Sequence, residues 1–214
     1  MNNQGIGPIW YFSPADVNLA RDPRWGRGQE VASEDPFLNG EFGILLTGHL
    51  EKPTAPSVGV GAAPGATSQY RAAISCTKHF AAYDCENCSP CDFKTMDSFF
   101  NYTTDKSQLY CDRQHFDALV PDQDIVDFYL PAFRAVIESS SSSSVMCSYN
   151  QINGVPSCGN SFLLNHMLRE EWGFDGFVIS DCGALISDSL FTVTFCANPA
   201  NDLTCPPLIY YDLI

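Results

Sequence analysis

The chain has 214 residues and a formal net charge of −14 at pH 7, from 25 acidic and 11 basic side chains. This charge argues against nucleic acid or an anionic membrane surface as partner and suits a neutral or cationic ligand. With 45% hydrophobic and 13% aromatic residues, the chain can bury a core and is not disordered by composition. No stretch approaches the ~20 apolar residues of a membrane span, so we expect no membrane insertion.

The cysteine content favours an oxidising compartment. Ten cysteines are many for a cytosolic domain of this length. Two glycosylation triplets, Asn87-Cys88-Ser89 and Asn101-Tyr102-Thr103, lie in the same cysteine-rich stretch. We therefore expect an extracellular, secreted protein. The first residues, MNNQGIGPIWYF, lack the basic start and apolar run of a signal peptide, so we also expect the natural N-terminus to lie elsewhere.

Short apolar runs alternate with helical patterns along the chain. Pro36 follows the potential caps Ser33 and Asp35 and predicts a helix to about Leu50. A second apolar face recurs at helical spacing over residues 122–138, and Pro131 predicts a kink or a late start there. Asn160 is a candidate cap for a third helix that ends before Gly173. The predicted strands are Ile9–Phe12, with Val17–Leu19 as a further candidate, Ala73–Cys76, Val145–Cys147 and Phe177–Ile179.

This alternation predicts an α/β fold with a parallel sheet and right-handed crossovers. The sequence has no glycine-rich dinucleotide motif and no Walker lysine, which leaves nucleotide folds without support. A (β/α)8 TIM-type barrel fits better, but such a barrel needs eight strands and typically ~250 residues. We therefore expect an incomplete barrel that holds about the middle strands only. Three segments, 53–65, 84–112 and 139–144, are predicted to be loops or insertions.

Polar residues gather directly after the apolar runs. Lys78 and His79 follow the predicted strand that ends at Cys76, Tyr149 follows the next strand, and Asp181 follows the last. Arginines 21, 24 and 27 follow the first strand. In a parallel barrel these positions converge on one mouth. Such a group, surrounded by Trp25, Phe80 and Trp172, would suit a sugar, with Asp181 as a nucleophile for an anomeric carbon.

Five motif blocks follow one another in the sequence over residues 8–184. The first extends from Arg21 to Glu30 with Glu34-Asp35-Pro36, and the others are Lys78-His79-Phe80, the stretch from Val145 to Asn150, Asn153-Gly154, and the stretch from Ile179 to Gly183. In content and order these blocks resemble the N-terminal barrel of glycoside hydrolase family 3, most closely its β-xylosidase branch, with β-glucosidases next. The resemblance covers residues 1–184, including a cysteine-rich insertion at 85–112, and residues 185–214 form a divergent tail.

The resemblance implies a role for each matching position. Asp181 matches the catalytic nucleophile of a retaining mechanism. Arg27, Lys78, His79 and Tyr149 match residues that hold the sugar beside the scissile bond. The basic members would also keep Asp181 ionised. The implied activity is hydrolysis of terminal β-D-xylosyl or β-D-glucosyl residues from oligosaccharides, and no metal or organic cofactor is implied.

Two departures limit the expectation of activity. The family's general acid is a glutamate in a later domain, and this sequence has no counterpart of it. The family's barrel also has an earlier strand that carries a sugar-binding aspartate, and that strand has no counterpart here either. We therefore expect a truncated or mis-assembled gene product, inactive alone; an upstream and downstream coding sequence in the transcript would test this. The alternative is a non-catalytic sugar-binding or disulfide-rich interaction module.

The cysteines allow two interpretations. The spacing of Cys85, Cys88 and Cys91 could hold a metal or an iron–sulfur cluster, but disulfides fit a secretory setting better. Cys147 and Cys158 flank a short turn with Gly154 and Pro156, so we expect these two to pair.

Overall fold

A computed structural model describes residues 9–10, 16–23, 25–52, 71, 73–88, 100–101, 111–114, 116–140, 142–182 and 184. Its helices are η1 (Gly28–Glu30), α1 (Pro36–Leu50), α2 (Asp122–Asp124), η2 (Ile125–Tyr129), α3 (Pro131–Ser140), η3 (Ser157–Gly159) and η4 (Phe162–Glu171). Its longer strands are β3 (Cys76–Phe80), β8 (Ser144–Cys147) and β11 (Phe177–Ser180). Its two-residue strands are β1 (Ile9–Trp10), β2 (Ala73–Ile74), β4 (Asn87–Cys88), β5 (Phe100–Asn101), β6 (Cys111–Asp112), β7 (Asp117–Ala118), β9 (Gln151–Ile152) and β10 (Val155–Pro156).

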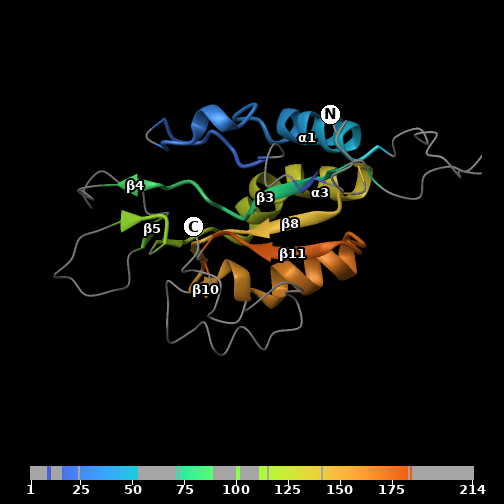
Figure 1. Ribbon diagram of the computed structural model, residues 1–214. Helices are drawn as coiled ribbons and strands as arrows, with labels where there is room; N and C mark the ends of the chain where they lie inside the picture. Colours follow the sequence, from blue (N-terminus) through green and yellow to red (C-terminus); the bar gives the residue numbers. More distant parts are fainter. Residues whose placement is uncertain are drawn as a thin grey trace, which may run out of the picture.

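The centre of the molecule is a parallel sheet in the order β11-β8-β3 (Figure 1). Ser180 of β11 and Phe80 of β3 both align with Cys147 of β8. A fourth segment, residues 16–19, runs parallel beside β3: Asp16 bridges Lys78, and the Val17 amide donates to the Lys78 carbonyl at 2.9 Å. Four adjacent parallel segments, each of the first three followed by helix, agree with an incomplete (β/α) barrel.

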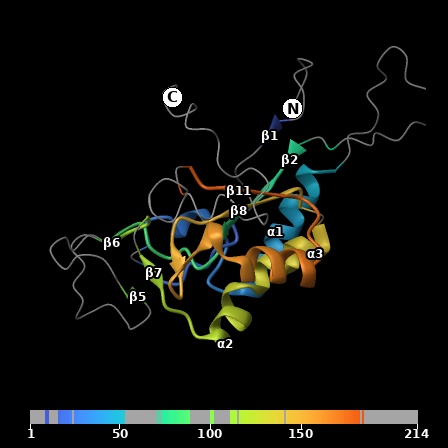
Figure 2. The same ribbon diagram turned by 90° about the horizontal axis from the view of Figure 1, so that it is seen from below.

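Helices α1 and α3 pack side by side, and Figures 1 and 2 show them together on one side of the strands. Gly43 of α1 makes this approach possible, because an added Cβ there would lie 2.5 Å from Val136 and 2.8 Å from Val17. The start of α1 follows the sequence prediction: Asp35 accepts the amides of Phe37 at 2.7 Å and Leu38 at 3.0 Å. Pro36 occupies the first helical position.

The other two predicted helices are also present, with differences in detail. The helix predicted over 122–138 divides into α2, the wide-turn helix η2 and α3, and the break falls at Leu130, just before Pro131. The Leu163 amide donates to Asn160 Oδ1 at 3.1 Å, as expected of a cap. Gly173, directly beyond the helix, has a φ of +69°, which glycine adopts without strain.

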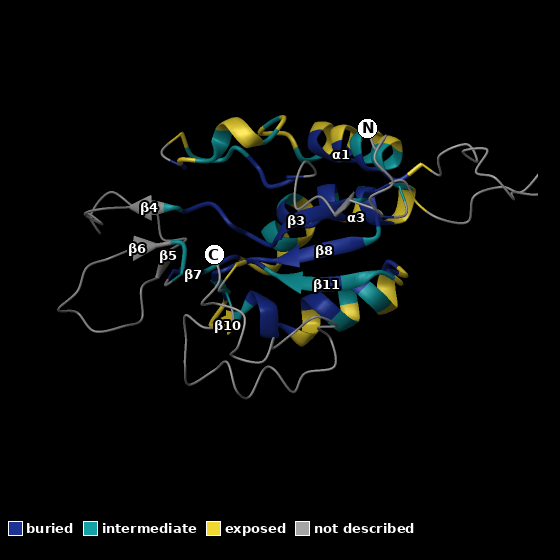
Figure 3. Ribbon diagram, in the orientation of Figure 1, coloured by how far each residue is buried: buried dark blue, intermediate teal, exposed yellow. Residues whose placement is uncertain are grey.

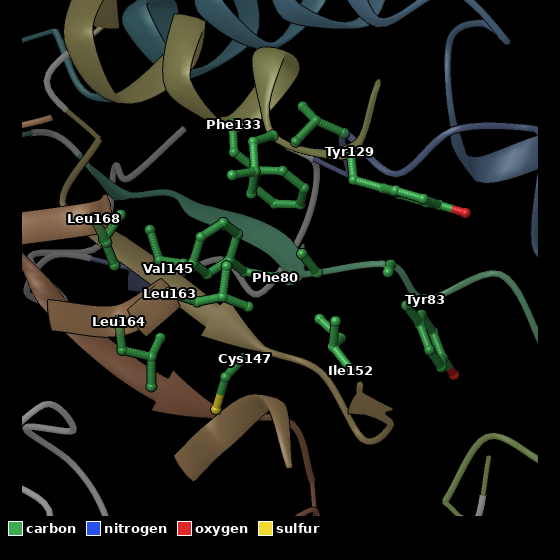
Figure 4. Close-up of a cluster of buried hydrophobic side chains, with 14 of the residues drawn as sticks. Phe80, Tyr83, Tyr129, Phe133, Val145, Cys147, Ile152, Leu163, Leu164 and Leu168 are labelled. Atoms are coloured by element: carbon green, nitrogen blue, oxygen red, sulfur yellow. The ribbon is translucent and has the colours of Figure 1, made fainter. Parts of the chain in front are cut away.

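Buried apolar side chains from the strands and helices form one core (Figures 3 and 4). Phe80 is fully buried and packs against Phe133 and Trp172, with ring centroids 5.0 and 5.9 Å apart. Each such burial contributes roughly 1.5–3 kcal/mol. Phe80 and Trp172 were predicted to surround a sugar; that prediction is wrong, because their rings fill the core.

One predicted strand is longer than expected, one predicted loop is shorter, and other predicted segments fall outside the described ranges. Strand β3 runs on to Phe80, so Lys78 and His79 lie within the strand and do not follow it. The connection predicted over 139–144 is reduced to 141–143, because α3 includes Ser139 and Ser140 and β8 begins at Ser144. The ends of the predicted insertion meet, since β4 pairs antiparallel with β6. Residues 53–65 and 185–214 lie outside the described residues.

Cys147 and Cys158 form the expected disulfide. It links the end of β8 to η3, eleven residues further along the chain. The side chains of Cys88 and Cys91 lie outside the described residues, so their predicted disulfides stay predictions. Within the described ranges, no helix is long and apolar enough to cross a membrane.

Candidate active site

The parallel strands deliver Asp181 to the carboxyl edge of the sheet. It directly follows β11, and its amide donates to the Cys147 carbonyl of β8 at 3.1 Å. Asp181 Oδ1 accepts the Cys182 amide at 2.7 Å, whereas Oδ2 is buried and has no hydrogen-bond partner among the described residues. The site therefore offers one carboxylate oxygen that is held in place but left unpaired.

His79 lies against this free oxygen. Its Nε2 is 3.5 Å from Asp181 Oδ2, and its side chain is 2% exposed. Burial lowers the pKa of His79 well below its usual value, and the nearby cations Arg27, Lys78 and Arg113 lower it further. The imidazole is therefore neutral at physiological pH.

Asp16 and Asn18, on the segment beside β3, hold His79 from the other side. Asn18 Oδ1 accepts the His79 amide at 2.8 Å, and Asn18 Nδ2 donates to the His79 carbonyl at 3.0 Å. Asp16 Oδ2 is 3.4 Å from His79 Nδ1. Burial raises the pKa of Asp16 to about 6, against the lowering effect of the Asn18 amide and the Lys78 and Arg27 charges. Sequence reasoning did not single out either residue, although Asp16 and Asn18 alternate with apolar Val17 and Leu19.

Arg27 approaches the site from the loop before α1. It forms a bidentate pair with Glu30, at 2.8 and 2.7 Å, and its NH1 is 3.5 Å from Glu86. The hydrogen bond to Glu30 raises the pKa of Arg27 and lowers that of Glu30. The Arg27 guanidinium also lies 5.6 Å from the ring of Tyr83, whose hydroxyl donates to Glu86 at 2.5 Å. This predicted residue is therefore charged and fixed near His79.

Tyr149 and Lys78 complete the predicted group. The Tyr149 hydroxyl donates to the Cys182 carbonyl at 2.8 Å, and burial together with the Asp181 charge raises its pKa. Lys78 is buried within β3, and its charge acts on Asp16 and His79. The structure thus brings Asp181, His79, Arg27 and Tyr149 together at one edge of the sheet, with Lys78 buried in the adjacent strand β3.

Arg113 is a site residue that the sequence analysis missed. Its guanidinium lies 4.6 Å from the centre of the Tyr149 ring and 3.6 Å from Glu86. Glu86 and Arg113 stand at the two ends of the cysteine-rich segment, and the Arg113 amide donates to the Glu86 carbonyl at 2.7 Å. The segment between them separates the two residues in sequence, so their spacing gave no signal.

The other predicted arginines have different outcomes. Arg21 donates to the hydroxyl of Tyr129, and its guanidinium lies over the Phe128 ring. Tyr129 in turn donates to the buried carboxylate of Asp84 at 2.6 Å. Arg21 therefore belongs to a structural network with Tyr129 and Asp84. Arg24 lies outside the described residues.

An unpaired acid at the end of a parallel strand, surrounded by basic and aromatic side chains, is typical of a (β/α)-barrel hydrolase site. Comparisons with known proteins agree. Residues 113–195 match the Glycosyl hydrolase family 3 N terminal domain. The resemblance predicted from the sequence is thereby confirmed over these residues.

Individual relatives are described as glycosidases. Beta-D-xylosidase 1 of Arabidopsis thaliana is 35% identical over 86% of this chain and 20% of its own length. A probable exo-1,4-beta-xylosidase of Aspergillus clavatus is 37% identical over the same shares. This chain therefore spans about a fifth of the length of these relatives.

Solved structures agree with the fold. A GH3 exo-beta-xylosidase in complex with a xylobiose aziridine activity-based probe gives a TM-score of 0.63 at 32% identity, over 86% of this chain and 20% of that one. Beta-glucosidase 3B from Thermotoga neapolitana in complex with glucose gives 0.60 at 27% identity, over 92% and 21%. The predicted fold class, an incomplete TIM-type barrel, is thereby confirmed.

Proposed function

We propose that this chain supplies the nucleophile and sugar-binding part of a retaining glycosidase that acts on terminal β-D-xylosyl or β-D-glucosyl residues. The observation that carries the proposal is the buried, unpaired Oδ2 of Asp181 beside neutral His79. Relatives described as β-xylosidases support xylosides, and the β-glucosidase structures support glucosides.

In this mechanism Asp181 attacks the anomeric carbon while the bond to the leaving group breaks, which gives a glycosyl ester. Water then cleaves that ester and restores the carboxylate. The cations Arg27, Lys78 and Arg113 surround the site, and their donors can hold sugar hydroxyls as the oxocarbenium-like transition state forms. The general acid that protonates an ordinary leaving group is proposed to lie outside this chain. Secretion, suggested by the cysteines and glycosylation triplets, stays part of the proposal.

A dinitrophenyl β-xyloside tests the nucleophile without the general acid, because dinitrophenolate leaves unprotonated. We expect release above background with the 214-residue chain and its loss in Asp181→Ala. Asp117→Asn is the matched control: Asp117 is a buried carboxylate that accepts the amide of Gly154, in the turn between β9 and β10, at 2.9 Å. A 2-fluoro xyloside should add one sugar mass to the wild-type chain and none to Asp181→Ala.

The alternative is a module that binds sugar without turnover. Calorimetric binding of xylose with no dinitrophenolate release and no covalent adduct would favour that alternative. Release that persists in Asp181→Ala would contradict the nucleophile assignment.

A further inference from the structure

Two carboxylates bracket the His79 ring, one at each nitrogen. Asp16 Oδ2 lies 3.4 Å from Nδ1, and Asp181 Oδ2 lies 3.5 Å from Nε2. Both oxygens are buried and have no hydrogen-bond partner among the described residues. A neutral imidazole carries one N–H, so it can donate toward only one of these carboxylates.

Asn18 decides which nitrogen carries the proton. Its Nδ2 donates to the His79 carbonyl, and its Oδ1 accepts the His79 amide, so the orientation of the amide group is fixed. The same Oδ1 lies 3.0 Å from His79 Nδ1. An acceptor there requires a hydrogen on Nδ1, and the negative Asp16 carboxylate on the same side favours it further.

We propose that Asp16 is a positioning residue that, together with Asn18, holds His79 as the Nδ1–H tautomer and so leaves a lone pair on Nε2 facing the Asp181 nucleophile. Nε2 and Asp181 Oδ2 then form a pair of adjacent acceptors without a donor. Such a pair is unfavourable when empty and is relieved by a hydroxyl group that donates into it. The pair therefore selects a ligand that places a hydroxyl group between Nε2 and Oδ2. This inference about the ligand rests on the proposed glycosidase function.

The charges around His79 favour the neutral imidazole that the Nδ1–H tautomer requires. Arg27, Lys78 and Arg113 face it with positive charge, Asp16 and Asp181 face its two nitrogens, and the Tyr83 ring packs 4.8 Å away. Desolvation and the three cations both disfavour the imidazolium. The Asp16 carboxylate, 3.4 Å from Nδ1, favours a hydrogen on that nitrogen.

The test is the nitrogen-15 spectrum of His79, recorded on the full chain and assigned with His79→Gln. The wild type should show a protonated Nδ1 and an unprotonated Nε2 at pH 8. In Asp16→Asn the amide group replaces the carboxylate, and we expect the ratio of Nδ1–H to Nε2–H forms to fall about tenfold. Asp117→Asn should leave the ratio unchanged.

A second measurement needs no variant. Because the pKa of Asp16 is raised to about 6, the wild-type tautomer ratio should shift as the pH falls from 8 to 5. A wild-type His79 that carries its proton on Nε2, or a ratio unchanged in folded Asp16→Asn, would overturn the proposal. Absent glycosidase activity with the expected spectrum would count against the proposed function and leave this inference standing.

Discussion

The Tyr149 hydroxyl donates a hydrogen bond of 2.8 Å to the carbonyl of Cys182, the residue that follows Asp181. This bond ties the end of β8 to the end of β11 at the point where the proposed nucleophile leaves the strand. Because Tyr149 also lies under the Arg113 guanidinium, it connects two parts of the site that are distant in sequence.

Tyr149→Phe should therefore lower kcat/KM for dinitrophenyl xyloside while the ring remains under Arg113. The lost hydrogen bond is worth roughly 1 kcal/mol, which corresponds to about a fivefold to tenfold loss. Tyr129→Phe is the matched control, since its buried hydroxyl lies outside the site on Asp84; it should reduce thermal stability and spare the rate per folded molecule. Equal rate losses in the two variants would argue against the connecting role of Tyr149.

A second prediction concerns the pH dependence of stability through Asp84. Burial raises the pKa of Asp84 from 3.8 to about 6, against the lowering effects of the Tyr129 hydrogen bond and the Arg21 charge. Between pH 4 and 6 the native state therefore binds more protons than the unfolded state, so its stability falls as the pH rises. A shift of this size amounts to about 3 kcal/mol in total, most of which is lost between pH 4 and pH 7.

Asp84→Asn should remove this pH dependence. The free energy of unfolding of the variant should therefore rise relative to that of the wild type as the pH increases from 4 to 7. Tyr129→Phe should have the opposite effect, because it removes the donor that favours the ionised carboxylate. Urea unfolding at several pH values measures both. Parallel stability–pH curves for the wild type and Asp84→Asn would contradict the assignment.

The sequence anticipated the parts of this molecule that depend on local pattern. Asp35 with Pro36, Asn160 with Gly173, and the strand directly before Asp181 are short-range signals, and the structure contains each. The extent of β3 was missed because Lys78 and His79 are polar residues inside a fully buried strand. Their burial depends on Asp16 and Asn18, about sixty residues away, and no local pattern reports such a partner.

The site residues also divide into those indicated by local sequence patterns and those that depend on distant contacts. Motif order indicated Asp181, Arg27, Lys78, His79 and Tyr149, whereas Arg113 and Glu86 emerge only when the ends of the cysteine-rich segment meet at β4 and β6. Aromatic residues were misassigned for a related reason. Phe80 adjoins His79 in sequence, but side chains alternate between the two faces of a strand, and Phe80 faces the core.

The disulfide between Cys147 and Cys158 should stabilise the end of β8. Closing a loop of eleven residues is worth roughly 3 kcal/mol in the chain-entropy estimate. The double variant Cys147→Ala/Cys158→Ala should therefore unfold at lower urea concentration, and reductant should have the same effect on the wild type. Cys182→Ala, which changes an exposed thiol with no disulfide in the structure, is the control. Reductant that destabilises the double variant as much as the wild type would refute this explanation.

Glu51 should matter for stability and not for chemistry, because it lies at the opposite end of the strands from Asp181. It is 4% exposed and accepts the amides of Ser75 and Ser143, each at 2.9 Å, which precede β3 and β8. Both serine hydroxyls and the Arg71 guanidinium also donate to it. Its carboxylate thus joins α1 to the amino ends of two strands.

Glu51→Gln replaces one of these acceptor oxygens with a donor and leaves buried groups unpaired. We expect a loss of about 2–4 kcal/mol in the free energy of unfolding, with an unchanged rate per folded molecule. Glu138→Gln, which alters an exposed i,i+4 pair with Arg134, should change stability by less than about 0.5 kcal/mol. A stable Glu51→Gln variant with reduced rate would mean that the amino and carboxyl ends of the sheet are coupled, and would contradict a purely stabilising role for Glu51.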